Sequence, residues 1–379
     1  MKKIIIIIGI VIILILLGVL FFINDSATML REGIFSGPDI GDTTDNTIPG
    51  DIQNEDEDEQ FVLSGPLTQL TTRPVTGYNI VQTSSTTDPV IYFAEAGTGH
   101  VYSIDYYDFS EVRISNTTIQ GATQVLFSDD GQFAVFLGDS ITVLSLPTAS
   151  SAETSTFTLY ETAESAAIIG DTLLYQVKEN NSTGVKSYQL GSGLASERLF
   201  TIPFREAVVA WGSAINGPHF YYPKTASSLE GYLYSYVDGI TNREPVSGFG
   251  LSAVAVNDSV LFTTSDDNQL LKSYSLDGTF QEYFIRSNPH KCAPVSATNE
   301  FICGQPETYE SNTDKDRMIG TVATKDRIRT LGVSDASVGQ ILEVSEEAGI
   351  SIDVTHPIYA FESLLFTNKT TGNLWLYAF

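Results

Sequence analysis

A repeated unit of short strands and tight turns dominates the sequence after residue 60. Within residues 122–148, apolar runs at Val125–Phe127, Phe133–Leu137 and Ile141–Leu146 alternate with the turn sequences Ser128-Asp129-Asp130-Gly131 and Gly138-Asp139-Ser140. Asp and Gly favour turns, because Asp bonds its own backbone and Gly tolerates positive φ. Apolar runs of about five residues are too short for a helical stripe, so this segment predicts antiparallel hairpins.

Similar hairpins recur along the chain, with turns near Gly97, Gly138, Asn180, Ala226 and Asp266. A period of about 40 to 50 residues built from four short strands is typical of a β-propeller. The units are predicted at Tyr78–Asn116, Ala122–Tyr160, Ala166–Phe200, Ala207–Pro245, Leu251–Ile285, Cys292–Val344 and Ile350–Phe379. The fold class is therefore all-β, a seven-bladed propeller; six or eight blades also fit, because the fourth and sixth units are irregular.

The last unit is predicted to lack an outer strand. Its strands are expected at Ile350–Val354, Leu364–Thr367 and Leu374–Phe379, after which the chain ends. The segment Val62–Leu70 precedes the first unit and has no sheet of its own, so we expect it to supply the missing strand and close the ring. An insertion is predicted around Ser334–Gly349.

The N-terminus predicts a membrane anchor. Lys2 and Lys3 precede Ile4–Ile23, a run of 20 apolar residues that spans about 30 Å as a helix. The alternative is a cleaved signal peptide, whose apolar region has only about 7 to 15 residues. Residues 26–28, Ser-Ala-Thr, are a poor cleavage site. The lysines favour residues 1–3 in the cytoplasm and everything from Asn24 outside the cell membrane.

Residues 24–60 are predicted to be an acidic flexible linker that tethers an extracytoplasmic propeller at residues 61–379. Nine acidic residues occur in Gly37–Gln60, with few apolar ones to offset ordering entropy. A divalent-cation site is the alternative for the run Glu55–Glu59, but the Gly and alternating ligands of a calcium loop are missing. The linker is therefore expected to be a solvated spacer.

Composition restricts the partners of this chain. At 42% hydrophobic residues, most of the chain has enough apolar surface to bury a core. The 46 acidic and 20 basic residues give a net charge of -26. That charge repels phosphate backbones and anionic lipid headgroups, so it argues against nucleic acid as a partner and favours a cationic or neutral one.

Cys292 and Cys303 flank the polar turn Ser296–Glu300 in a predicted hairpin outside the membrane, where oxidation is permitted. A disulfide is the expected interpretation. A metal or redox pair is the alternative, but CxxC spacing and a His close in sequence are both missing.

Other chemistry-bearing residues form no recognisable motif. His100, His219, His290 and His356 fall in different units, although a propeller channel can bring two together. Acidic triplets at residues 129–131, 266–268 and 314–316 resemble fragments of calcium loops, and turn chemistry accounts for them. No nucleophile elbow, phosphate loop or dinucleotide fingerprint occurs. The sequence therefore predicts no catalytic, cofactor-binding or metal-binding residues and no cofactor.

Several runs resemble a family of membrane-anchored propellers from small-genome bacteria of the candidate phyla radiation. They include Leu70–Gly77, Gly97–Tyr102, Pro203–Glu206 with Trp211, Gly231–Tyr234, Asp353–Thr355 and Leu365–Lys369 with Leu374-Trp375. The turn Phe127–Gly131 is also similar to the repeats of TolB-like propellers. The resemblance implies topology and an extracytoplasmic location, and it implies no catalytic residues.

These observations predict a single-pass, N-terminus-in protein whose propeller binds or scaffolds protein partners in the cell envelope. The alternative is an envelope glycan or peptide hydrolase or lyase acting at the propeller channel. An enzyme needs carboxylates, His or a metal converging at one end of the channel. An exposed apolar patch on one face favours docking instead.

Overall fold

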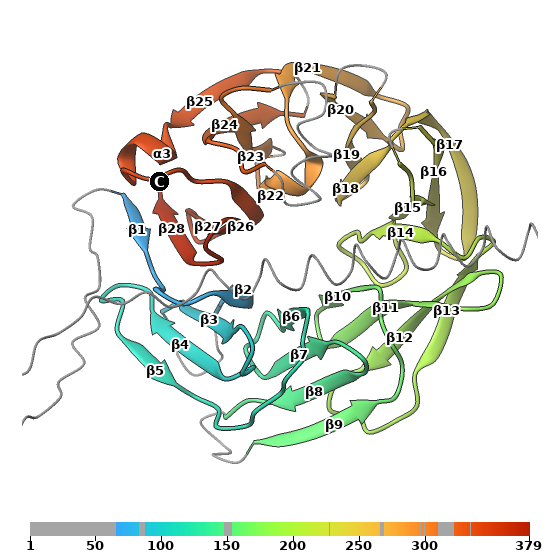
Figure 1. Cartoon of the computed structure of the whole chain (residues 1–379). Coiled ribbons are helices and arrows are strands. Elements are labelled where there is room, and N and C mark those ends of the chain that lie inside the picture. The colour runs from blue at the N-terminus through green and yellow to red at the C-terminus, as the bar shows by residue number, and fades with distance from the viewer. Residues whose placement is uncertain are drawn as a thin grey trace, which may run out of the picture. The chain divides into compact units, whose positions relative to one another are not determined.

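In a computed structural model, the chain forms seven four-stranded antiparallel sheets arranged as blades around a central axis (Figure 1). The structure describes residues 66–82, 88–147, 154–226, 228–265, 269–295, 297–298, 300–309, 322–333 and 335–379. This architecture confirms the all-β, seven-bladed prediction. Each sheet follows the chain order from its innermost to its outermost strand, except the last, which has the order β1-β28-β27-β26.

In the first four blades the inner strands are largely hydrophobic runs between turn residues, and the outermost strands are more polar and exposed. Blade 1 contains β2 (Val75–Val81), β3 (Val90–Glu95), β4 (Val101–Asp105) and β5 (Glu111–Arg113). Blade 2 contains β6 (Gln124–Phe127), β7 (Phe133–Leu137), β8 (Ile141–Ser145) and β9 (Ser155–Leu159). Blade 3 contains β10 (Ser165–Ile169), β11 (Thr172–Lys178), β12 (Thr183–Gln189) and β13 (Glu197–Ile202). Blade 4 contains β14 (Ala207–Ala210), β15 (His219–Pro223), β16 (Glu230–Val237) and β17 (Ile240–Phe249).

Two short helical segments accompany the strands of the last three blades. Blade 5 contains β18 (Ser252–Val256), β19 (Ser259–Thr263), β20 (Leu270–Ser275) and β21 (Phe280–Arg286). The 3-10 helix η1 (Pro289–Lys291) leads into blade 6, which contains β22 (Cys292–Val295), β23 (Glu300–Pro306), β24 (Asp326–Gly332) and β25 (Val338–Leu342). The helix α3 (Val344–Glu347) leads into blade 7, which contains β26 (Val354–Ala360), β27 (Ser363–Asn368), β28 (Leu374–Ala378) and β1 (Leu67–Gln69).

Strand β1 closes the ring, as the sequence predicts. It pairs antiparallel with β28 in a register that places Leu67 opposite Tyr377 and Gln69 opposite Trp375. Leu67 is 0% exposed and packs in one cluster with Phe366 and Trp375. Residues from the start of the described chain and from its end thus share one sheet, which removes an open strand edge at β28.

The structure corrects two details of the last two blades. The predicted first strand at Ile350–Val354 is displaced, because β26 begins at Val354 and continues through Pro357. Pro357 is tolerated because it lies at a bulge between Thr355 and Ile358, on a strand paired only with β27. The predicted insertion at Ser334–Gly349 contains the outer strand β25, whose backbone pairs with β24.

Seven hydrophobic clusters provide the core, and each lies between two neighbouring blades. Innermost strands of adjacent blades approach closely, which requires a small residue. A Cβ at Gly77 of β2 would lie 1.9 Å from the carbonyl oxygen of Val125 in β6. Alternating apolar side chains on both faces of each blade thus pack the ring around its circumference.

Candidate functional site

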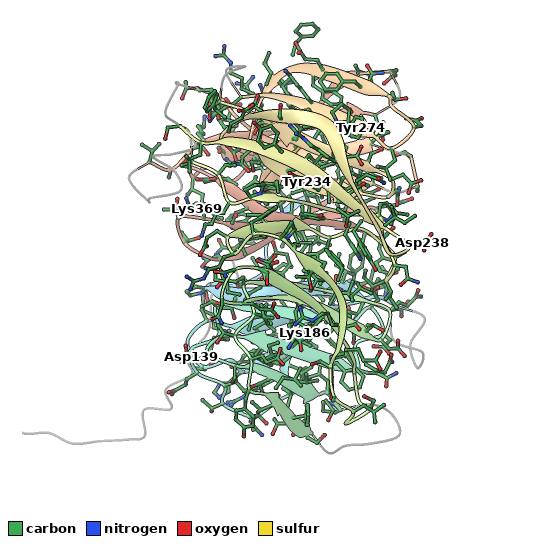
Figure 2. The ribbon with its side chains drawn as sticks, turned by 90° about the vertical axis from the view of Figure 1, so that its right-hand side faces the viewer. Asp139, Lys186, Tyr234, Asp238, Tyr274 and Lys369 are labelled. Carbon is green, nitrogen blue, oxygen red and sulfur yellow. A yellow bond between two sulfur atoms is a disulfide. The ribbon has the colours of Figure 1, made fainter. Side chains whose placement is uncertain are left out.

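The ring has two ends with different origins in the chain. Because each blade is an antiparallel meander, the turns after its first and third strands lie at one end, and the remaining connections lie at the other. Figure 2 shows Asp238, which follows β16, at one edge and Asp139 and Lys369, which follow β7 and β27, at the opposite edge. We call the first end the closure face, because Phe379 follows the third strand of blade 7 there, and the second end the connection face.

Exposed aromatic side chains gather on the closure face where blade 7 meets blade 1. Tyr107 lies in the turn between β4 and β5 and is 66% exposed. Phe361 lies in the turn between β26 and β27, and Phe379 follows β28; they are 42% and 49% exposed. We call Tyr107, Phe361 and Phe379 the closure patch.

Direct contacts hold the closure patch together across the two blades. The Tyr106 hydroxyl donates to the Phe361 carbonyl oxygen at 3.0 Å, and the rings of Tyr106 and Tyr107 meet edge to face at 5.3 Å. The Phe379 amide donates to the Glu362 carbonyl oxygen at 2.9 Å. The Phe379 ring also packs 4.9 Å from that of Tyr377. The patch is therefore an ordered surface of the ring.

The turn that contains Phe361 has residue types that are unusual for its backbone geometry. It is a two-residue hairpin loop, because Ala360 pairs with Ser363, and Phe361 and Glu362 have φ values of 50° and 56°. Two-residue loops with positive φ at both positions strongly favour Asn-Gly or similar pairs, since bulky residues are strained there. Phe109, on the blade 1 side, also has a positive φ of 58°. Asp238, Asn257 and Ala336 in turns of other blades also have positive φ, but at Phe361-Glu362 two bulky residues in a row adopt it, which makes this turn a candidate for a role other than stability.

The described turns of the closure face carry negative charges only. The exposed acidic residues in its first-to-second-strand turns are Asp88, Asp129, Asp130, Asp171, Asp258 and Glu362. Among the residues that the structure describes, those in its third-to-fourth-strand turns are Asp108, Asp238, Asp277 and Asp335. No Lys or Arg occurs among the described residues of these turns. The face therefore presents an aromatic patch within an acidic surround.

Carboxylates of the connection face are, in contrast, interleaved with cations. Lys178 Nζ lies 3.1 Å from carboxylate oxygens of both Glu164 and Glu206. Lys325 Nζ lies 3.0 Å from Glu307 Oε1. The two ends of the ring therefore differ in electrostatic character, which sequence order alone does not reveal.

A buried ionic cluster joins blades 6 and 7. The Lys291 ammonium lies 2.6 Å from Asp326 Oδ2 and 3.0 Å from Asp353 Oδ1, and these three side chains are at most 1% exposed. Lys291 also donates to Thr324 Oγ1 at 2.6 Å, and the Val354 amide donates to Asp326 Oδ2 at 2.9 Å. Burial, reinforced by the nearby Asp353 carboxylate, raises the pKa of Asp326 despite Lys291. These contacts fix the connections that lead into blades 6 and 7.

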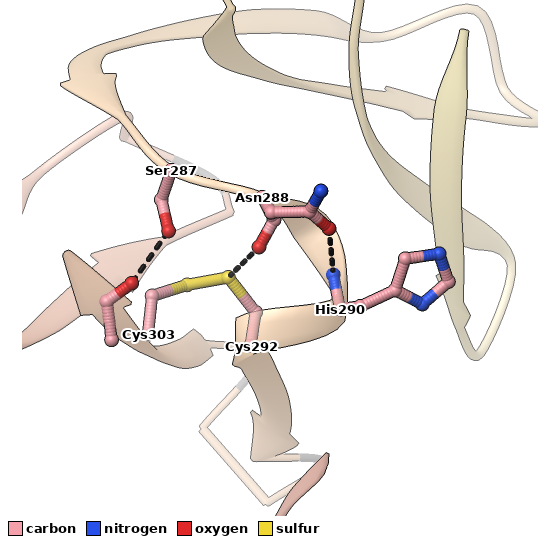
Figure 3. Close-up of a disulfide and its surroundings, with 6 residues drawn as sticks. Ser287, Asn288, His290, Cys292 and Cys303 are labelled. Atoms are coloured by element: carbon pink, nitrogen blue, oxygen red, sulfur yellow. Dashed lines mark hydrogen bonds between the residues drawn. A yellow bond between two sulfur atoms is a disulfide. The ribbon is translucent and has the colours of Figure 1, made fainter. Parts of the chain in front are cut away.

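The structure contains the predicted disulfide. Cys292 and Cys303 face each other on β22 and β23 and are bonded (Figure 3). The preceding segment is fixed by hydrogen bonds, since the Ser287 hydroxyl donates to the Gly304 carbonyl oxygen at 2.5 Å and Asn288 Oδ1 accepts from the His290 amide at 2.9 Å. The imidazole of His290 points away from the disulfide (Figure 3). Both cysteines are buried, so the bond belongs to the core between blades 5 and 6.

The four histidines remain apart, in blades 1, 4 and 7 and in η1 before blade 6. His100 Nδ1 lies 3.6 Å from Glu95 Oε2. His219 is 0% exposed; its Nδ1 accepts from the Gly212 amide at 3.1 Å, and its Nε2 lies 3.0 Å from the Ile215 carbonyl oxygen. Those contacts fit a neutral imidazole that carries its proton on Nε2. Burial lowers the pKa of His219, which therefore acts as a structural residue of blade 4.

His219 makes the stability of the propeller depend on pH. Its pKa is lowered from 6.5, so the unfolded chain binds more protons than the folded chain just below that pH. The free energy of unfolding therefore falls as the pH drops below about 6.5. We expect His219→Gln to reduce this slope below about pH 6.5, measured by urea denaturation at a series of pH values. Equal slopes in wild type and His219→Gln would contradict this assignment.

Turn chemistry explains the one calcium-loop fragment that the structure describes. Asp130 Oδ1 accepts from the Ser128 hydroxyl at 2.7 Å and from the Gln132 amide at 3.0 Å. Residues 266–268 and 314–316 lie outside the described residues. Within the described part of the chain, no group of three or more His, Cys, Asp or Glu side chains is arranged to hold a metal ion.

The predicted membrane anchor and acidic linker also lie outside the described residues. In the part that the structure describes, no helix has the length and hydropathy needed to cross a bilayer. Sequence analysis did not identify the closure patch or the Lys291 cluster. One signal was available for the patch, namely Phe-Glu at a hairpin position where Asn or Gly is expected.

No protein-family model and no curated protein sequence matches the chain. Among solved structures, the β-propeller domain of Cps50 (Swd1) from Myceliophteria thermophila is 7% identical with a TM-score of 0.55, over 82% of this chain and 98% of that one. An oligogalacturonate lyase from Vibrio parahaemolyticus is 10% identical with a TM-score of 0.54, over 82% of this chain and 92% of the lyase. At such low sequence identity, the similarity shows a shared fold and nothing about function. The chain is an all-β protein with a seven-bladed β-propeller.

Proposed function

We propose that this chain is a membrane-anchored, extracytoplasmic propeller that binds protein partners in the cell envelope through its closure patch. The anchor rests on the apolar run Ile4–Ile23 behind two lysines, and the reach rests on the acidic linker at residues 24–60. One observation carries the binding role: aromatic side chains are exposed together on one face. Exposed aromatic residues on a rigid scaffold commonly serve recognition.

The strained turn strengthens the argument for docking. If Phe361 and Glu362 served stability alone, Asn-Gly would serve better at these positions, because it adopts positive φ at little cost. The chain instead places a phenylalanine at the tip of the turn, where it is 42% exposed. The chain thus keeps an exposed aromatic side chain at the cost of a less stable turn, as expected where a residue serves binding rather than stability. Aromatic residues are also enriched among residues that dominate interface energies.

A double substitution separates binding from folding. We expect Phe361→Asn/Glu362→Gly to raise the free energy of unfolding by about 1 to 2 kcal/mol, because the turn loses its strain. The same variant is expected to lose the partner, because it removes an aromatic anchor. Full-length wild type and variant would serve as baits for native cell envelope, with recovered proteins quantified by mass spectrometry.

Phe284→Asn is the matched control for this capture experiment, because Phe284 is 86% exposed on β21, away from the closure patch. A protein recovered equally by wild type and the control, but not by the turn variant, supports the proposed role. Equal recovery by all three baits contradicts it.

A further inference from the structure

The carboxylates beside the closure patch lack neutralising partners. Glu362 follows Phe361 in the turn, and Asp108 follows Tyr107. The Tyr359 ring packs 5.5 Å from the Phe379 ring of the patch, and its pKa is raised by burial and, to a smaller extent, by the nearby carboxylates of Glu362 and Glu300. Among the described residues, no Lys or Arg forms an ion pair with Glu362, Asp108 or Glu300.

These charges remain available to a partner. Asp108 accepts a hydrogen bond from the Ser110 amide at 2.8 Å, and hydrogen bonding from the Ser110 hydroxyl and then from this amide lowers its pKa, so its carboxylate is ionised at neutral pH. The Thr298 hydroxyl donates to Glu300 Oε2 at 2.7 Å, a contact that leaves the negative charge in place. Since the other described turns of this face add carboxylates and no Lys or Arg, the patch sits in a negative potential.

From this combination we infer that the closure face binds a basic polypeptide segment that carries apolar side chains. The inference rests on the proposed function and names the chemistry of the partner. Apolar or aromatic side chains of the segment pack on Phe361 and Phe379, while its Lys and Arg residues face Glu362, Asp108 and the turn carboxylates. An Arg guanidinium also stacks favourably on exposed Tyr and Phe rings, so both features of the face favour the same ligand.

Charge argues against the other occupants of this surface. A second copy of the chain that presented the same face would bring acidic turns against acidic turns. The chain's own segment Gly37–Gln60 carries nine acidic residues and no Lys or Arg, so it is repelled from the patch. Anionic lipid headgroups are repelled for the same reason. A basic segment is the occupant whose charge is complementary.

Synthetic peptides test the inference on the full-length chain, purified in a non-ionic detergent. The first peptide alternates Arg with Trp and Leu, the second replaces every Arg by Ser, and the third replaces every Trp and Leu by Ser. Binding is measured by fluorescence anisotropy at low and high salt. We expect only the first peptide to bind, with an affinity that falls about tenfold as NaCl rises from about 50 to 500 mM.

Charge reversal locates the binding. We expect Glu362→Lys to lower the affinity for the first peptide by about tenfold, because it turns an attraction at the patch into a repulsion. Asp139→Lys is the matched control, because it makes the same charge change at an exposed position on the connection face, and its effect is expected to stay within about twofold. Equal weakening by both variants would mean diffuse attraction to the whole acidic chain and would overturn the inference.

Other results separate this inference from the proposed function. If the neutral peptide binds as well as the basic one and Phe361→Asn/Glu362→Gly abolishes both, the patch docks a partner that need not be basic, and only the inference fails. Binding of no peptide also overturns the inference, and the envelope capture then decides the proposed function independently. Self-association of the chain that Glu362→Lys strengthens would identify a second copy as the occupant and overturn it as well.

Discussion

Replacement of Lys291 by methionine is expected to lower the free energy of unfolding by about 3 to 5 kcal/mol. Lys291 is the cation between Asp326 and Asp353, and the three side chains are at most 1% exposed. Methionine fills a similar volume but leaves two buried carboxylates without a counter-charge. The cost is the desolvation of those carboxylates, which the ammonium at present offsets.

Urea denaturation of wild type and variant measures this loss. Lys224→Met is the matched control, because Lys224 is exposed and its replacement is expected to change stability by less than about 0.5 kcal/mol. A further variant, Lys291→Met/Asp326→Asn, removes one of the two orphaned charges and is expected to recover part of the loss. If Lys291→Met costs as little as Lys224→Met, the cluster does not hold blades 6 and 7 together.

The second large effect concerns ring closure. We expect Leu67→Asp to destabilise the propeller by at least about 4 kcal/mol, because it combines loss of a fully buried leucine with burial of an unpaired carboxylate. Leu67 is 0% exposed and packs against Phe366 and Trp375. Detachment of β1 would also free the edge of β28, which promotes aggregation.

Hydrogen exchange provides a local readout for this variant. The Ala378 amide donates to the Pro66 carbonyl oxygen at 2.9 Å, and the Leu70 amide donates to the Leu374 carbonyl oxygen at 2.8 Å. Faster exchange of these two amides than of amides in blade 3 would indicate opening at the closure. Leu194→Asp, at a position 67% exposed, serves as the control and is expected to leave stability and exchange unchanged. Uniform exchange in Leu67→Asp would contradict a local role for β1.

Much of the fold was predictable because it follows from local patterns. Short apolar runs and Asp, Gly and Asn turns recur at a fixed period, and antiparallel neighbours need no long-range information to pair. Two errors arose where a local rule fails. A strand was predicted at Ile350–Val354, yet β26 runs from Val354 to Ala360, because its unpaired inner edge tolerates Pro357. An insertion was predicted at Ser334–Gly349, yet Val338–Leu342 within it pairs with β24 and forms the strand β25.

The site was less predictable, because it depends on residues that lie far apart in the chain. Tyr106 and Phe361 are separated by 255 residues and meet through one hydrogen bond. Lys291 and Asp353 belong to connections before different blades and meet only once blades 6 and 7 are packed together. The contact within each pair has no sequence signature, because it forms only when different blades pack together.

By itself, then, the sequence determined the blade repeat, the closing strand and the pairing of Cys292 with Cys303, because each depends on short-range spacing or on the composition of strands and turns. Only the tertiary structure decided which turns share a face. Alternate turns lie at opposite ends of the ring, so that, among the described residues, the closure-face turns carry carboxylates and no Lys or Arg, whereas Lys178 and Lys325 form ion pairs with carboxylates of the connection face. Closing the ring brings the aromatic residues of blades 1 and 7 together, because side chains distant in sequence become neighbours only when the first and last blades meet.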